Sequence, residues 1–197
     1  MRVFQQPVSR TGFSRVAVLT ALWLLLSPVL GAQAASLESQ HMQRLDEAAP
    51  DFRLRDASGR TLHLADLRGH GIILHFWATW CEPCREELPT LEAMVRQLAD
   101  SGVILVAVAI DEEPDIARVR RYAHDLDVTF PVYLASEGTI SDRYWSWGVP
   151  VTYLIDLQGR LVARSLGPRN WASPSMHALI TQLVAPKSRK LRESNVR

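Results

Sequence analysis

Two runs of consecutive apolar residues lie in the first half of the chain, and a helical pattern separates them. Residues 72–77 and 103–110 have the apolar density of strands that are buried on both faces of a sheet. Between the runs, apolar residues recur at helical spacing over residues 88–98, and Ser101-Gly102 ends the pattern. A strand, a helix and a second buried strand form a βαβ unit, which predicts parallel pairing with a right-handed crossover.

Shorter patterned segments complete the predicted fold. Alternation around a turn-like segment predicts an N-terminal hairpin over residues 49–64, and a second hairpin is predicted over residues 151–165. A short strand is predicted over residues 130–134. Further helices are predicted at three places: residues 114–124, 139–147 and 171–184. This order predicts an α/β fold with a central mixed β-sheet flanked by helices and an N-terminal β-hairpin extension.

The first 34 residues have the pattern of an export signal. Three arginines and no acidic residue accompany a mostly apolar stretch over residues 16–30, and residues 32–34 are Ala-Gln-Ala, which suits signal peptidase. An uncleaved membrane anchor is the alternative, although Pro28 interrupts the run and its length is short of the ~20 residues that span a bilayer. Either way we expect the domain to work in the periplasm, soluble or anchored to the inner membrane.

Length and charge limit the number of domains and the class of partner. The 197 residues have room for one domain, predicted over residues 49–185 behind a linker over residues 35–48. The net charge of the whole chain is +1. Without the first 34 residues, 19 basic and 21 acidic residues remain, and the net charge is −2. Basic side chains gather in residues 186–197, where a solvated, disordered tail is commoner than a nucleic-acid contact. No nucleic-acid partner is predicted, and we expect a monomer.

The only two cysteines, Cys81 and Cys84, are three positions apart. A disulfide that closes so short a loop removes little entropy from the unfolded chain, so a stapling role explains the pair poorly. The pair supplies only two of the four ligands of a zinc site, and the sequence has no second CxxC and no HxxxH motif. Redox chemistry is the remaining interpretation, and neither a metal nor a cofactor is predicted.

Residues 76–89 read Phe-Trp-Ala-Thr-Trp-Cys-Glu-Pro-Cys-Arg-Glu-Glu-Leu-Pro and closely resemble the thioredoxin superfamily. The segment looks most like the TlpA/ResA-type reductases of the bacterial cell envelope, which include the thiol reductases of cytochrome c maturation. Two further blocks occur in the order of that family, Ala-Pro-Asp-Phe at residues 49–52 and Gly-Val-Pro at residues 148–150. The resemblance extends over roughly residues 49–166 and implies a thioredoxin-like fold.

The expected chemistry follows from the places of the two cysteines. Cys81 is predicted at the junction of a strand and a helix, where free backbone N–H groups and the helix dipole stabilise a thiolate, the attacking species. Cys84 lies one turn further along the helix, so we expect it to be less exposed and to resolve the mixed disulfide by attacking Cys81. The oxidised protein then has a Cys81–Cys84 disulfide. Glu82 disfavours the neighbouring thiolate, which favours a reductant over an oxidant.

The resemblance also implies roles for residues outside the CxxC motif. Pro150 matches a proline whose bond to the preceding residue, here Val149, is cis in the family and lies beside the reactive cysteine, where it helps to hold substrate. Trp80 is predicted to form part of the surface that substrate touches. Glu87 matches an acidic group beneath the active site that is linked to proton handling, and an ordinary solvated glutamate is the alternative. The other tryptophans after the leader are predicted to be packing residues: Trp77, Trp145, Trp147 and Trp171.

His75 departs from the family pattern. It lies six positions before Cys81, where thioredoxins carry a buried acid and many envelope relatives carry asparagine. A histidine on a buried strand is usually a satisfied core residue. The alternative hypothesis is a proton relay, in which the neutral imidazole accepts the proton of the Cys84 thiol and tunes its pKa.

Together these features predict a protein thiol–disulfide oxidoreductase that reduces disulfides of envelope proteins. The resemblance suggests apocytochrome c as substrate and a membrane thiol transporter as electron donor. A copper-handling protein of oxidase assembly is the alternative, which would bind Cu(I) with two soft ligands or reduce copper-site cysteines in a partner. A peroxiredoxin is discounted, because its peroxidatic cysteine has Thr or Ser three positions before it, whereas Thr79 is two positions before Cys81.

Overall fold

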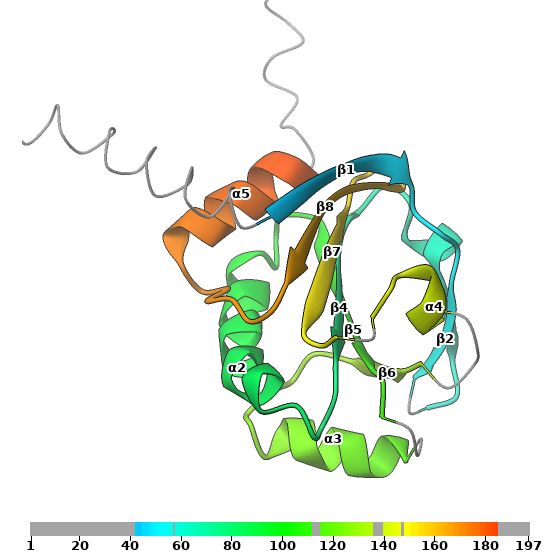
Figure 1. Ribbon diagram of the computed structural model, residues 1–197, viewed down its shortest axis with the longest axis vertical. Helices are drawn as coiled ribbons and strands as arrows, with labels where there is room; N and C mark the ends of the chain where they lie inside the picture. Colours follow the sequence, from blue (N-terminus) through cyan, green and yellow to red (C-terminus); the bar gives the residue numbers. More distant parts are fainter. Residues whose placement is uncertain (1–41, 57, 112–114, 136–139, 147, 185–197) are drawn as a thin grey trace, which may run out of the picture.

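The computed structural model describes residues 42–56, 58–111, 115–135, 140–146 and 148–184 (Figure 1). The predicted signal or anchor (residues 1–34), the first part of the predicted linker and the predicted tail (residues 186–197) lie outside the described residues. Within the described ranges, no helix combines the length and the apolar character needed to cross a membrane.

Strand β4 (Gly71–Trp77) lies at the centre of the eight-stranded sheet that the described residues form, and all of its positions are buried. It pairs in parallel with β5 (Val103–Ala109) and antiparallel with β7 (Val151–Ile155). Helix α2 (Glu82–Gln97) makes the crossover from β4 to β5, which confirms the predicted βαβ unit. Both faces of β4 are covered, as expected of a strand that is apolar except for His75.

The remaining strands extend the sheet on both sides, in the order β1-β8-β7-β4-β5-β6-β2-β3. Their bounds are β1 (Met42–Ala48), β2 (Arg53–Asp56), β3 (Thr61–His63), β6 (Val132–Leu134) and β8 (Arg160–Leu166). Strands β2 and β3 form the predicted N-terminal hairpin, and β7 and β8 form the later one. The predicted α/β class with a mixed sheet and an N-terminal hairpin is therefore confirmed.

The helices cover both faces of the sheet (Figure 1). Their bounds are η1 (Leu64–Leu67), α3 (Ile116–His124), α4 (Ile140–Arg143) and α5 (Pro174–Val184). Side chains of α2, α3 and α5 share one apolar cluster, and those of η1 and α4 share a second. The helix predicted over residues 139–147 is shorter than expected, because the backbone reaches a φ of 46° at Trp145, which a right-handed helix cannot continue.

The predicted linker over residues 35–48 is wrong in its second half. Residues 42–48 form β1, the edge strand, which pairs antiparallel with β8. Met42 is the only one of its side chains that is buried, so the segment has no apolar alternation from which a strand could be predicted. Its place depends on backbone pairing and on Arg160, whose Nε lies 3.0 Å from Oδ1 of Asp46.

Gly71 begins β4 directly beside the end of α5. A Cβ atom at this position would lie 2.1 Å from the backbone oxygen of Val184, so a side chain fits only if backbone moves. We expect Gly71→Ala to lower the free energy of unfolding by about 1–3 kcal/mol, measured by urea denaturation. Gly148→Ala is the matched control, because a Cβ there meets nothing within 4 Å. Equal loss of stability in both variants would contradict the close approach at Gly71.

Candidate active site

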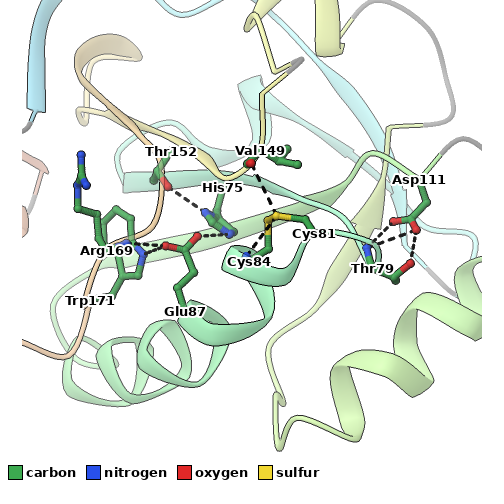
Figure 2. Close-up of a disulfide and its surroundings, with 10 residues drawn as sticks. All are labelled: His75, Thr79, Cys81, Cys84, Glu87, Asp111, Val149, Thr152, Arg169 and Trp171. Atoms are coloured by element: carbon green, nitrogen blue, oxygen red, sulfur yellow. Dashed lines mark hydrogen bonds and ion pairs between the residues drawn. A yellow bond between two sulfur atoms is a disulfide. The ribbon is translucent and has the colours of Figure 1, made fainter.

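Cys81 is the N-cap residue of α2, and a disulfide joins it to Cys84 (Figure 2). The backbone N–H of Cys84 points at the Cys81 sulfur, with N and Sγ 3.2 Å apart. This is the contact with a helix N-terminus that the sequence predicts, and it stabilises negative charge on Cys81 when the disulfide opens. Cys81 is 5% exposed and Cys84 is 0% exposed, so an incoming partner reaches Cys81 first.

The turn between β4 and α2 is fastened to the end of β5. Asp111, two residues after β5, accepts hydrogen bonds from the Thr79 hydroxyl (2.5 Å) and from the Thr79 backbone N–H (3.2 Å to Oδ2). Parallel neighbouring strands end at the same edge of a sheet, which brings Asp111 to the motif. Sequence reasoning missed this residue. The available signal was a polar residue just past a buried strand that pairs with the strand before the motif.

Val149 approaches the disulfide from the segment just before β7, and Pro150 follows it in sequence (Figure 2). The peptide bond between them is cis, as the family resemblance predicts. The Val149 carbonyl oxygen lies 3.7 Å from the Cys81 sulfur. Trp80, on the other side of Cys81 in sequence, is 63% exposed. The Val149 carbonyl thus lies next to the Cys81 sulfur, and an exposed tryptophan directly precedes Cys81 in sequence.

The other tryptophans divide between the interior and the surface. Trp77 and Trp171 are fully buried, as predicted. The prediction of a packing role for Trp145 is wrong, because 55% of the residue is exposed and its ring faces the Arg164 guanidinium at 5.6 Å. The preceding residue, Tyr144, is buried instead, and its hydroxyl donates a hydrogen bond to the Pro50 carbonyl oxygen. Trp147 lies outside the described residues.

Glu87 lies one helical turn after Cys84 and is buried, with 2% exposure. The alternative of a solvated surface glutamate is therefore wrong. Its Oε2 accepts hydrogen bonds from the Arg169 backbone N–H (2.9 Å) and from Nε1 of Trp171 (3.1 Å). Burial raises the pKa of Glu87 to about 7, against the opposing effect of these hydrogen bonds and of the Arg169 charge. The carboxyl can thus take up or release a proton near neutral pH.

His75 lies on β4, fully buried, beside Glu87 (Figure 2). Its Nε2 is 3.4 Å from Oε1 of Glu87, and its Nδ1 is 2.9 Å from the hydroxyl oxygen of Thr152, the residue opposite it on β7. Burial lowers the pKa of His75 to about 3, so the imidazole is neutral at physiological pH.

The residues that complete this buried site were not identified from the sequence. Thr152 and Trp171 supply partners to His75 and Glu87, yet the first depends on the register of β7 and the second on where the chain returns after β8. A hydroxyl in an otherwise apolar strand was the one available signal for Thr152. Within the described residues, no group of three or more His, Cys, Asp and Glu side chains could hold a metal ion.

Comparison with known proteins gives this geometry a context. Residues 45–164 match the AhpC/TSA family. The thiol-disulfide oxidoreductase ResA of Bacillus subtilis is 33% identical over 150 residues, which cover 75% of this chain and 83% of that protein. ResA of Oceanobacillus iheyensis is 34% identical over 145 residues, 71% of this chain and 74% of that protein.

Solved structures of similar proteins also include thiol–disulfide proteins. StoA from Bacillus subtilis has a TM-score of 0.57 and 25% identity, over 67% of this chain and 98% of that one. A thiol:disulfide interchange protein of the thioredoxin family from Chlorobium tepidum has a TM-score of 0.60 and 25% identity, over 72% and 98%. The predicted thioredoxin-like fold is therefore confirmed.

Glu87 and His75 have opposite effects on how stability depends on pH. The pKa of Glu87 is about 7 in the folded protein against an ordinary 4.5, so between these values the folded state keeps a proton that the unfolded state has lost. Stability then falls as pH rises. The pKa of His75 is about 3 against an ordinary 6.5, so the unfolded state binds the extra proton and stability rises with pH. Between pH 4.5 and 6.5 the two slopes cancel.

Glu87→Gln removes the contribution to stability that falls as pH rises and leaves the His75 contribution, which rises with pH. Relative to the parent protein, we expect the free energy of unfolding of this variant to increase by about 3 kcal/mol between pH 4.5 and 7.5. Urea denaturation of the oxidised proteins across this range measures it. Glu86→Gln changes the exposed neighbour and should follow the parent at every pH. A Glu87→Gln profile that runs parallel to the parent would show that Glu87 titrates normally.

Proposed function

Because the chain belongs to the AhpC/TSA family of thioredoxin-like proteins, we propose that it reduces disulfide bonds of proteins in the cell envelope with Cys81 and Cys84. Its enzyme class is thiol–disulfide oxidoreductase, which its relatives share by name. One observation carries the proposal: the disulfide-bonded pair at the N-terminus of α2 leaves Cys81 slightly accessible, with 5% exposure, and buries Cys84 completely, one helical turn before an acid whose pKa is about 7.

The first step is attack on the substrate. In the reduced enzyme the Cys81 thiolate attacks one sulfur of the substrate disulfide, forms a mixed disulfide and releases the other substrate sulfur as a thiolate. The Val149 carbonyl and Pro150 border this sulfur, and we assign to them the backbone contacts that hold the substrate segment. Trp80 supplies exposed apolar surface for the same segment.

The second step returns the substrate in reduced form. The Cys84 thiol passes its proton to the Glu87 carboxylate, and the new thiolate attacks the Cys81 sulfur. The Cys81–Cys84 disulfide forms and the second substrate sulfur leaves as a thiolate. A dithiol donor then reduces the enzyme disulfide, and Glu87 returns the proton to Cys84. We assign the proton to Glu87 rather than to His75, because burial holds the pKa of His75 at about 3.

Partners and location follow from the same proposal. Apocytochrome c is the substrate we propose, since its haem-binding cysteines must be reduced before attachment, and a membrane thiol transporter is the proposed donor. The export pattern of residues 1–34 supports a periplasmic site of action, with cleavage or anchoring as the two forms. Glu82 is exposed next to Cys81 and disfavours a persistent thiolate, which supports reduction over oxidation.

A resolving-cysteine variant tests the proposal. Cys84→Ser cannot complete the second step, so Cys81 should remain joined to its substrate, and mass spectrometry of complexes purified from the native host should identify a c-type apocytochrome. Cys81→Ser/Cys84→Ser is the matched control and should capture nothing.

Two results would count against it. Equal capture by both variants would remove Cys81 as the nucleophile. A midpoint potential of the parent protein above about −150 mV would make it an oxidant, because reducing members of this class lie well below that value.

A further inference from the structure

Three buried polar side chains form one row from α2 through β4 to β7: Glu87, His75 and Thr152 (Figure 2). Each belongs to a different element, and each neighbour in the row is within 3.4 Å. Buried polar groups need partners in every protonation state that they visit, since an unpaired one costs free energy. The row therefore has to accommodate both forms of Glu87.

The two oxygens of Glu87 are not equivalent. Oε2 already accepts two N–H groups, from the Arg169 backbone and from the Trp171 indole. Neither donor can accept a proton in return, so Oε2 serves as an acceptor only. Oε1 accepts no hydrogen bond among the described residues, and Nε2 of His75, which also has no hydrogen-bond partner there, lies 3.4 Å away. When Glu87 is protonated, its proton is therefore on Oε1.

A neutral imidazole matches either state of Oε1, provided that its own proton is on the right nitrogen. Protonated Oε1 donates to a bare Nε2, which places the imidazole proton on Nδ1 as a donor to Thr152. Ionised Oε1 needs a donor, which places the imidazole proton on Nε2 and leaves Nδ1 as an acceptor. The Thr152 hydroxyl can accept in the first arrangement and donate in the second.

We propose that His75 is a positioning residue that changes tautomer whenever Glu87 gains or loses its proton, with Thr152 as the partner of both tautomers. This inference rests on the proposed function, in which Glu87 exchanges a proton with Cys84. His75 holds one proton in both states, at Nδ1 or at Nε2, so the row as a whole gains or loses only the proton of Glu87. The exchange leaves no buried charge or donor without a partner.

The surroundings restrict the row to this one proton. The charged group that acts on Glu87 from the segment after β8 is Arg169, and its charge lowers the pKa of the carboxyl. Cys81 and Cys84 are the redox groups on α2 itself. On the His75 side, Thr152 has no charge and the Trp171 ring lies edge-on at 6.5 Å. Burial away from water is the cause that lowers the pKa of His75.

Nitrogen-15 NMR of the oxidised protein tests the inference without any variant. The one-bond coupling between nitrogen and hydrogen identifies which ring nitrogen of His75 carries the proton. We expect Nδ1–H at pH 5.5 and Nε2–H at pH 8.5, with a midpoint that equals the carbon-13 midpoint of the Glu87 carboxyl. A single tautomer across this range while Glu87 titrates would overturn the inference, as would an imidazolium form above pH 5.

Variants add a second, independent readout. Glu87→Gln should fix one tautomer from pH 5.5 to 8.5, whereas Glu86→Gln should leave the switch intact. His75→Phe keeps a ring but removes Nε2 as the partner of both forms of Oε1. Because the hydrogen bond to the ionised form is the stronger of the two, the Glu87 midpoint should rise by about one pH unit. An unchanged Glu87 midpoint in His75→Phe would contradict the coupling.

The inference and the proposed function fail in different ways. A protein that reduces disulfides but keeps one His75 tautomer would lose only the switch. A protein that switches tautomer but captures no substrate through Cys81 would lose the proposed function, and the proton row would then serve another reaction of the same disulfide.

Discussion

The two hydrogen bonds that Glu87 accepts on Oε2 hold the site together. They join α2 to the segment after β8, residues that are 82 and 84 positions away in sequence. Without N–H donors, a carboxyl with so little exposure would not persist beneath the disulfide, because an unpaired buried acid costs several kcal/mol. With them, the acid is fixed in place and its other oxygen is free to face His75.

The central strand provides the second constraint. β4 places His75 on the face that α2 covers, and it ends at the turn that carries Trp80 and Cys81. Asp111 fixes that turn from the end of β5, and β7 brings Val149 to the same sulfur. The same three strands thus position the residues of the proposed sulfur chemistry and those of the proposed proton transfer. The division lets a partner reach Cys81 while Cys84 and its acid stay away from water.

Local pattern was enough to predict much of this architecture. The apolar runs of β4 and β5, the helical spacing of α2 and the two hairpins are each encoded within a few consecutive residues. The spacing of Cys81 and Cys84 predicted redox chemistry, and the family resemblance strengthened that prediction and led to Pro150 and Glu87. Strand β1 was missed because its side chains are mostly polar and exposed, so only its pairing with β8 defines it.

The residues that partner His75 and Glu87 depend on the register between β4 and β7 and on where a segment distant in sequence packs. Thr152 faces His75 only because β7 pairs with β4 in one register, and a shift by one residue would turn it to the other side of the sheet. Trp171 was expected to pack, which it does, but its indole N–H also reaches Glu87 from a distant segment. Trp145 was also expected to pack but is exposed, at a position with a positive φ after α4. Apart from the hydroxyl of Thr152 in an otherwise apolar strand, none of these outcomes has a local signature.

Transfer of the Cys84 proton to Glu87 is tested most directly by the rate at which a mixed disulfide at Cys81 resolves. Rapid mixing of the reduced protein with a disulfide-linked peptide, followed by acid quenching and mass analysis, gives this rate constant at each pH. It should rise with pH through a midpoint near 7, the pKa of Glu87. In Glu87→Gln the rise of the rate constant with pH should disappear, and the rate constant at neutral pH should be on the order of 100-fold lower. A variant with the parent's rate and pH profile would contradict a role for Glu87 as the base.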